Sequence, residues 1–161
     1  MPLGGTEGQM PKPGRLSEGI HVFPDDPAVR IRRVAAALKA SLDVLHGDPN
    51  TAGLLFESLC YRDLSVYASS MGGSVSHYRD NSGLEVDAVV QLDDGRWGAA
   101  EVKIGASESD RAASRLVAFK RKMTGAGVPE PSFLMVLNAT GAAAHTRPDG
   151  VAVVPVDCLA P

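Results

Sequence analysis

With 161 residues, of which 44% are apolar, the chain can bury one modest core and is too short for two comfortable domains. Aromatic residues make up only 5% of the sequence, so the core must consist mainly of Ala, Val and Leu; this favours helices packed on a small sheet over an all-β architecture. The formal charge of -3 excludes a uniformly basic surface, so any contact with nucleic acid must depend on a local patch.

Nothing in the sequence indicates a membrane protein or a zinc protein. No apolar run approaches the ~18 residues that a membrane-spanning helix needs, and the N-terminus has neither the charged region nor the apolar core of a signal peptide. We therefore expect no membrane contact and a cytoplasmic location. Cys60 and Cys158 have neither a CxxC partner nor a neighbouring histidine, which favours buried free thiols. The oligomeric state is not specified by any of these patterns.

The N-terminal part of the chain divides into a tail and a helical segment. Residues 1–19 are rich in glycine and proline and carry few large apolar side chains, so burial cannot offset the entropy of ordering them. We expect a disordered tail over 1–19 and a single domain over 20–161. Between Pro27 and Leu45, apolar residues recur at helical spacing, which predicts an amphipathic helix.

The centre of the chain changes from helical to strand periodicity. Thr51 can cap a helix that runs to about Met71, where two glycines stop it. Runs rich in valine follow, separated by good turn sequences. They predict three consecutive antiparallel strands, at about 74–80, 84–92 and 96–104.

The last third of the chain predicts one more helix and two buried strands. Ser107 and Asp110 resemble a capping pair at the start of a helix that ends near Thr124. Short apolar runs at 133–137 and 151–156 are typical of buried strands. The expected fold class is α/β, with a mixed sheet of about five strands flanked by helices.

The second predicted hairpin brings two carboxylates together. If Asp93 to Gly95 form a three-residue loop, counting back along the strands sets Asp87 opposite Glu101. Lys103 lies two residues beyond Glu101, so strand alternation turns it to the same face. Opposed carboxylates repel, which costs up to ~1 kcal/mol at a surface and more in a dry site, unless a cation lies between them.

A divalent cation would turn this repulsion into a function. Asp87 and Glu101 offer oxygen ligands for Mg²⁺, and the carbonyl of Val102 offers another. A metal-bound water would become a better nucleophile, and Lys103 could orient it and stabilise charge on a phosphate. Glu57 lies in an apolar helical stretch, where an unpaired charge is costly, so a metal, its water or Lys103 could compensate it.

At these residues the chain resembles the PD-(D/E)XK nuclease superfamily, with Asp87 as the D and Glu101-Val102-Lys103 as the (D/E)XK element. Glu57 matches the helical glutamate that precedes the strands there. More narrowly, the chain resembles the C-terminal domain of unknown function (family number 4143) attached to many prokaryotic AAA-type ATPases. The segments that carry this narrower resemblance are Gly53 to Leu59, His77 to Asp80, Glu85 to Asp87 and Glu101 to Lys103.

The resemblance covers roughly residues 20–158 and is strongest from Gly53 to Lys103. It implies a restriction-endonuclease-like three-layer core, Mg²⁺ as cofactor, and a nuclease-like phosphodiesterase domain acting on DNA or RNA. It also implies an AAA-type ATPase as a partner. The chain has no G-x-x-x-x-G-K phosphate-binding loop, so we expect no ATP hydrolysis by it alone.

Two plainer interpretations stay open. Lys103 can simply form a salt bridge with Glu101 or Asp87 on a solvated hairpin, with Glu57 on an exposed helix edge. In that case the chain is a catalytically inactive regulatory or interaction domain, detached from an AAA-type ATP-binding protein, or a truncated remnant of one. Fold alone does not separate these possibilities from a nuclease.

Four basic residues are weaker candidates for contacts with a nucleic-acid backbone. Arg79 could position a substrate phosphate, or form an ion pair with Glu85 across the first hairpin. Arg111, Arg115 and Lys122 form a basic stripe on the predicted third helix, which suits a phosphate backbone but is also typical of a solvated helix face.

Overall fold

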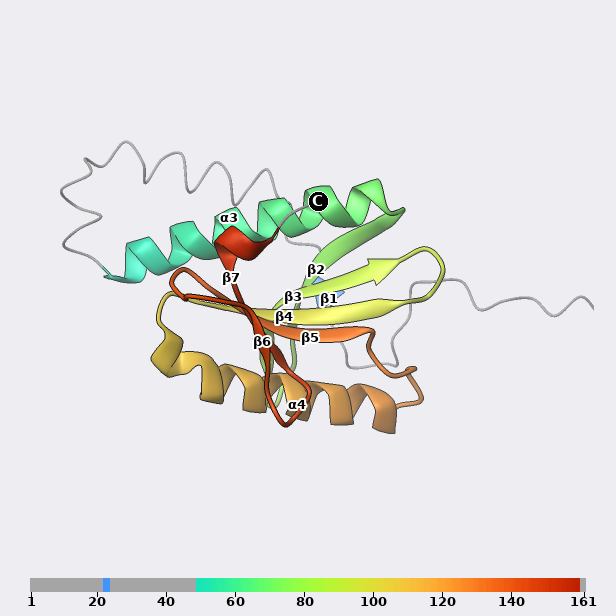
Figure 1. Ribbon diagram of the computed structural model, residues 1–161. Coiled ribbons are helices and arrows are strands. Elements are labelled where there is room, and N and C mark those ends of the chain that lie inside the picture. Colours follow the sequence, from blue (N-terminus) through green and yellow to red (C-terminus); the bar gives the residue numbers. More distant parts are fainter. Residues whose placement is uncertain (1–21, 24–48, 160–161) are drawn as a thin grey trace, which may run out of the picture.

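A computed structural model of the chain describes residues 22–23 and 49–159. A central sheet separates two helices, with α3 (Pro49–Ser70) on one face and α4 (Ser109–Gly125) on the other (Figure 1). This arrangement confirms the predicted three-layer α/β fold class. The predicted tail over 1–19 and the predicted helix between Pro27 and Leu45 lie outside the described residues.

The sheet is mixed and has seven strands in the order β1-β2-β3-β4-β5-β7-β6. Strands β1 to β4 pair antiparallel, β4, β5 and β7 pair parallel, and β6 returns antiparallel to β7. Their bounds are β1 (Val22–Phe23), β2 (Gly73–Arg79), β3 (Glu85–Leu92), β4 (Trp97–Lys103), β5 (Phe133–Asn138), β6 (His145–Thr146) and β7 (Ala152–Pro155). The five longer strands match the predicted ones, whereas β1 and β6 have two residues each, too few to leave an alternation in the sequence.

The two hairpins close where the turn sequences predict. In the β3–β4 loop the amide of Leu92 donates to Arg96 O over 2.8 Å, and Gly95 has φ 88°, a left-handed conformation that glycine adopts without strain. In the β2–β3 loop Asp80 Oδ1 accepts hydrogen bonds from the amides of Ser82 and Leu84. These local bonds fix the register of the strands on either side.

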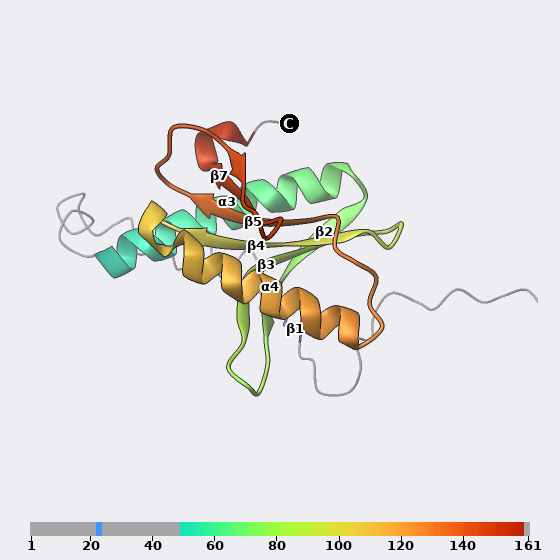
Figure 2. The same cartoon turned by 60° about the horizontal axis from the view of Figure 1, so that its bottom comes forward.

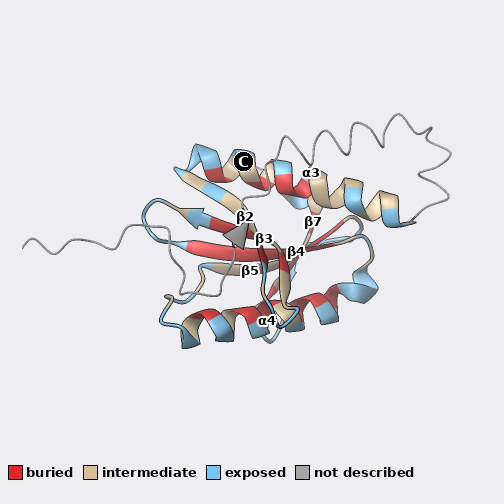
Figure 3. Cartoon of the chain, turned by 180° about the vertical axis from the view of Figure 1, so that it is seen from behind, coloured by how far each residue is buried: buried red, intermediate tan, exposed pale blue. Residues whose placement is uncertain are grey.

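Each face of the sheet carries its own core. On the α4 side, Leu116, Phe119 and Met123 pack against the buried residues of the sheet, and the Phe119 ring lies 4.6 Å from that of Tyr78. On the α3 side, Cys60, Tyr61 and Leu64 pack against alanine and leucine side chains of β4 and β5. Figure 2 shows α4 crossing the sheet, and Figure 3 shows the buried residues concentrated on β4 and on the sheet-facing side of α4. β4 is therefore the centre of the molecule, and a polar residue on it is enclosed.

Three local expectations are corrected by the structure. α3 begins at Pro49, so Thr51 lies inside the helix instead of capping it. The start of α4 is preceded by a 3₁₀ turn over Ala106–Glu108, which takes up Ser107; Glu108 is the N-cap and makes no side-chain capping bond. Cys60 is buried as expected, but Cys158 is exposed. In the described part of the chain no helix is long and apolar enough to cross a membrane.

Candidate metal centre

The β3–β4 hairpin sets the two predicted carboxylates side by side. The observed register pairs Gln91 with Trp97 and ends with Ala88 paired with Ala100, so Asp87 and Glu101 are the next residues on the two strands. On its other edge β3 has an irregularity, because the register with β2 shifts between Ser76 and Tyr78. Such β-bulges redirect side chains and are frequent next to functional sites. The predicted juxtaposition of the carboxylates is thus present.

The ammonium group of Lys103 lies among three oxygens. Lys103 Nζ is 2.8 Å from Glu101 Oε2 and 3.2 Å from Asp87 Oδ2, and it donates a hydrogen bond to the carbonyl of Val102 over 2.9 Å. Asp87 Oδ2 also accepts a hydrogen bond from the Val102 amide over 2.8 Å. These oxygens are the ones that the sequence predicts as ligands of a divalent cation, and here they surround a positive charge.

Glu101 is an enclosed carboxylate. Its side chain is 0% exposed, and its Oε2 forms an ion pair with Lys103, the only polar partner of this carboxylate among the described residues. Burial, and then the charge of Asp87, raise the pKa of Glu101 to about 7, although Lys103 and Arg115 act in the opposite direction. A buried carboxylate is costly unless a cation or a proton compensates its charge, and here Lys103 supplies the cation.

The pKa of the Lys103 amine is also shifted by this cluster. Burial lowers the pKa of Lys103, but the charges of Asp87 and Glu101 outweigh it, and the net result is a raised pKa. The amine is therefore a cation at neutral pH and holds the two carboxylates together. Removing either sign of charge from this cluster would leave the other without compensation.

The third predicted ligand, Glu57, lies on α3 and is half-buried. Burial, and then the charges of Asp63, Glu57 and Asp87, raise the pKa of the Cys60 thiol to about 12, so Glu57 and Asp87 both lie close enough to act on that group. Within the described ranges, however, no group of three or more His, Cys, Asp and Glu side chains is placed to hold a metal ion. The structure thus assembles the pair Asp87–Glu101 with Lys103, and leaves Glu57 outside it.

A shallow pocket of about 170 Å³ adjoins Lys103. Its lining residues are Lys103, Glu108, Arg111, Ala112 and Arg115, so α4 contributes most of its wall. Two of the four predicted basic candidates, Arg111 and Arg115, therefore lie in the same pocket as Lys103. Strand β4 places Lys103 at the boundary between the carboxylates and this pocket.

The other two basic candidates are used in ion pairs. Arg79 Nε lies 2.9 Å from Glu85 Oε1, which is the alternative that the sequence left open. Lys122 forms an ion pair with Asp80, whose side chain is only 4% exposed. The lysine and the hydroxyl of Ser82 are the main groups that lower the pKa of Asp80. The predicted basic stripe on α4 is thus divided between a pocket and a structural contact.

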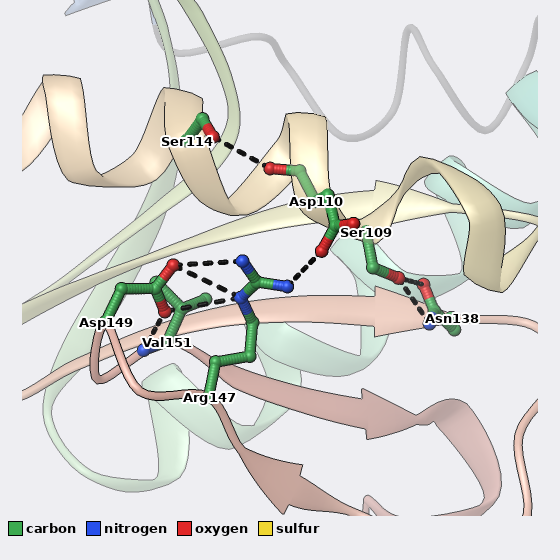
Figure 4. Close-up of polar contacts among 7 residues, drawn as sticks. All are labelled: Ser109, Asp110, Ser114, Asn138, Arg147, Asp149 and Val151. Carbon is green, nitrogen blue, oxygen red and sulfur yellow. Dashed lines mark hydrogen bonds and ion pairs between the residues drawn. The ribbon is translucent and has the colours of Figure 1, made fainter.

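A buried polar pair beside the site was not predicted from the sequence. Asn138, which is 2% exposed, ends β5 and pairs with Lys103 in the parallel register. Its Nδ2 donates to Ser109 Oγ over 3.0 Å, and this bond ties the first residue of α4 to the sheet (Figure 4). Figure 4 also shows Arg147 forming ion pairs with Asp110 and with Asp149. A polar residue at the end of the run 133–138 was the only available signal, and its neighbour depends on parallel pairing that a sequence does not specify.

Comparison with known proteins decides the family. Residues 52–159 match the family described as Domain of unknown function (DUF4143), and this match covers α3 except for its first three residues and everything from β2 to the end of the described chain. The chain belongs to this family. No match was found among curated proteins or among solved structures.

In this DUF4143 domain, the residues present suit a hard divalent cation. Mg²⁺ is bound in proteins through one or two carboxylates and completes its shell with water and substrate oxygens. Asp87, Glu101 and the Val102 carbonyl supply oxygens of this kind, and among the described residues Lys103 is the only polar partner of the buried Glu101 carboxylate. The Lys103 ammonium contacts all three residues, so their oxygens already lie around one positive charge.

Proposed function

We propose that this protein is a Mg²⁺-dependent phosphodiesterase of the PD-(D/E)XK type that acts on DNA or RNA. The single observation that supports this proposal most strongly is the position of the Lys103 ammonium among Asp87, Glu101 and the Val102 carbonyl. A cluster of this composition at the centre of an enclosed sheet is costly unless cations compensate it. A hydrolytic site for a charged substrate gives a reason for retaining it.

The proposed roles follow from the chemistry of each side chain. Asp87 and Glu101 would hold Mg²⁺, which when bound lowers the pKa of water and draws charge from a phosphoryl oxygen. Lys103 would then exchange its contacts with these carboxylates for a hydrogen bond to the phosphate, where it stabilises charge that develops during attack. Asn138 and Ser109 would act as positioning residues for α4. Glu57 has no ligand role in this proposal, because it does not join the pair.

Metal binding is the first test. Titration calorimetry of the purified protein with MgCl₂ and with MnCl₂ should show binding that Asp87→Asn and Glu101→Gln each weaken by at least about tenfold. Glu85→Gln is the matched control, because this carboxylate lies on the same strand as Asp87 but is paired with Arg79 at the surface. Equal metal binding by wild type and the Asp87 and Glu101 variants would contradict the assigned ligands.

The second test measures cleavage of several kinds of nucleic acid, because the proposed site could act on DNA or on RNA. Plasmid DNA, single-stranded DNA and RNA should be incubated with the protein and Mg²⁺ or Mn²⁺, with EDTA as the blank. Lys103→Ala should abolish cleavage while retaining metal binding, because it removes the ammonium and leaves the oxygens. Lys120→Ala is the control, since Lys120 of α4 is ion-paired with Glu130 and does not line the pocket. Metal-dependent cleavage that survives Lys103→Ala would contradict the mechanism.

A second candidate function is a regulatory or interaction domain without catalysis. The ion pairs of Lys103 with Asp87 and Glu101 favour it. Lys103 already compensates both carboxylates, so the cluster can be purely structural. This function predicts no metal binding in calorimetry, together with retention of an AAA-type ATPase in a pull-down from the native host. The calorimetric result therefore separates the two functions before any substrate is known.

A further inference from the structure

The cations of the described chain divide into paired and unpaired groups. Six arginine or lysine side chains outside the metal centre have a carboxylate within ion-pair distance: Arg62, Arg79, Arg96, Lys120, Lys122 and Arg147. Among the described residues, Arg111, Arg115 and Arg121 have no such partner. Two of these three line the same pocket, whereas Arg121 does not line it.

The pocket brings the two free guanidinium groups to the edge of the carboxylate cluster. Arg111 and Arg115 are four residues apart on α4, so they project from the same side of the helix. Lys103 forms part of the wall, and Glu108 is the one acidic lining residue. Arg115 acts electrostatically on Glu101, which places this guanidinium within range of the metal centre.

Free guanidinium groups in a concave site have a preferred kind of ligand. Each presents a planar set of N–H donors that matches the oxygens of a phosphoryl group, often with two parallel hydrogen bonds. Two of them, four residues apart, can share the oxygens of one phosphate. The volume of about 170 Å³ suits a phosphate with part of an attached group rather than an entire nucleotide chain.

We infer that Arg111 and Arg115 form a binding site for a phosphoryl group, with α4 as its wall and Lys103 at its inner end. The inference deepens the proposed function, on which it rests for the role of the phosphate as part of a substrate. The side chains that line the pocket are not the proposed ligands of the metal. The Ser109–Asn138 hydrogen bond fixes the end of α4 from which these arginines project.

The test measures phosphate binding without metal. The full chain in EDTA is titrated with inorganic phosphate, and binding is followed by the shifts of its amide signals in NMR. Arg111→Ala and Arg115→Ala should each weaken binding by about tenfold or more, as expected for hydrogen bonds between charged groups. Arg115→Lys should give an intermediate loss, because it retains the charge and loses the planar fork.

Arg121→Ala is the matched control, since this arginine is also unpaired on α4 but lies outside the pocket; it should bind phosphate like wild type. Unchanged binding in both pocket variants, or an equal loss in Arg121→Ala, would overturn the inference.

Short DNA oligonucleotides with and without a 5′-phosphate then identify the source of the phosphate: their binding should depend on the same two arginines if the ligand is a nucleic acid. Phosphate binding that depends on the arginines, without oligonucleotide binding, would assign the site to a small phosphorylated molecule. Because no metal is added, a failure of the metal centre leaves this result unaffected.

Discussion

The buried carboxylate of Glu101 makes the stability of the protein depend on pH in a way that one substitution should remove. In the folded chain its pKa is raised to about 7 from an ordinary value of 4.5, first by burial and then by the charge of Asp87. The folded state therefore binds a proton more tightly than the unfolded state between these two values. Stability must fall as the pH rises through this window, because the ionised carboxylate is tolerated poorly in the fold.

The size of the effect follows from the interval. A pKa difference between 4.5 and about 7, at about 1.4 kcal/mol per pH unit, corresponds to about 3 kcal/mol. Glu101→Gln cannot ionise, so it should lack this contribution. Relative to the variant, the wild type should lose about 3 kcal/mol of unfolding free energy between pH 4.5 and pH 8 when EDTA excludes metal ions.

Urea denaturation followed by circular dichroism at a series of pH values measures this difference. Other titrations occur in both proteins and largely cancel. Glu85→Gln is the control and should retain the wild-type dependence, because its side chain is 40% exposed and paired at the surface. Parallel stability curves for wild type and Glu101→Gln would refute the reasoning, since they would mean that Glu101 has the same pKa in both states. Added Mg²⁺ should restore wild-type stability at pH 8 if the proposed metal site exists.

Three further predictions concern the scaffold. Asp80→Asn should lower the free energy of unfolding by about 1–3 kcal/mol at pH 7 in urea denaturation, because the Asp80 carboxylate accepts hydrogen bonds from its own turn and from α4. The pKa of Asp80 is lowered in the folded chain, so this stabilisation is present above the ordinary pKa of 3.8 and is lost as the pH falls below that value. A thiol reagent should label only the exposed Cys158 in the folded chain and should label Cys60 only in denaturant. The reason is that Cys60 is 0% exposed and its pKa is raised to about 12. Rapid labelling of both cysteines in the native protein would contradict this prediction. Gly98→Ala should cost about 1–3 kcal/mol in thermal or urea unfolding, because its Cβ would lie 2.3 Å from the Phe133 ring; an unchanged midpoint would show that the ring moves freely.

Features that depend on residues close together in the chain could be predicted from the sequence. Turn residues close to one another set the loop lengths, and a three-residue loop leaves one register for the β3–β4 hairpin. That register was enough to predict Asp87 opposite Glu101, with Lys103 on the same side. The helical and strand periodicities likewise gave α3, α4 and the five longer strands to within a few residues.

Contacts between elements that are distant in the chain could not be predicted and became known from the folded structure. The parallel pairing of β4 with β5 sets Asn138 beside Lys103, and no local pattern specifies which parallel strands are adjacent. Arg111, Arg115 and Lys122 share one helical periodicity in the sequence. The packing of α4 across the sheet nevertheless gives them different surroundings, because the two arginines line the pocket and Lys122 is paired with Asp80. Two helices from separate segments of the chain bury the central strand on both faces. This burial encloses Glu101, so its ionised carboxylate is stable only when a cation compensates the charge.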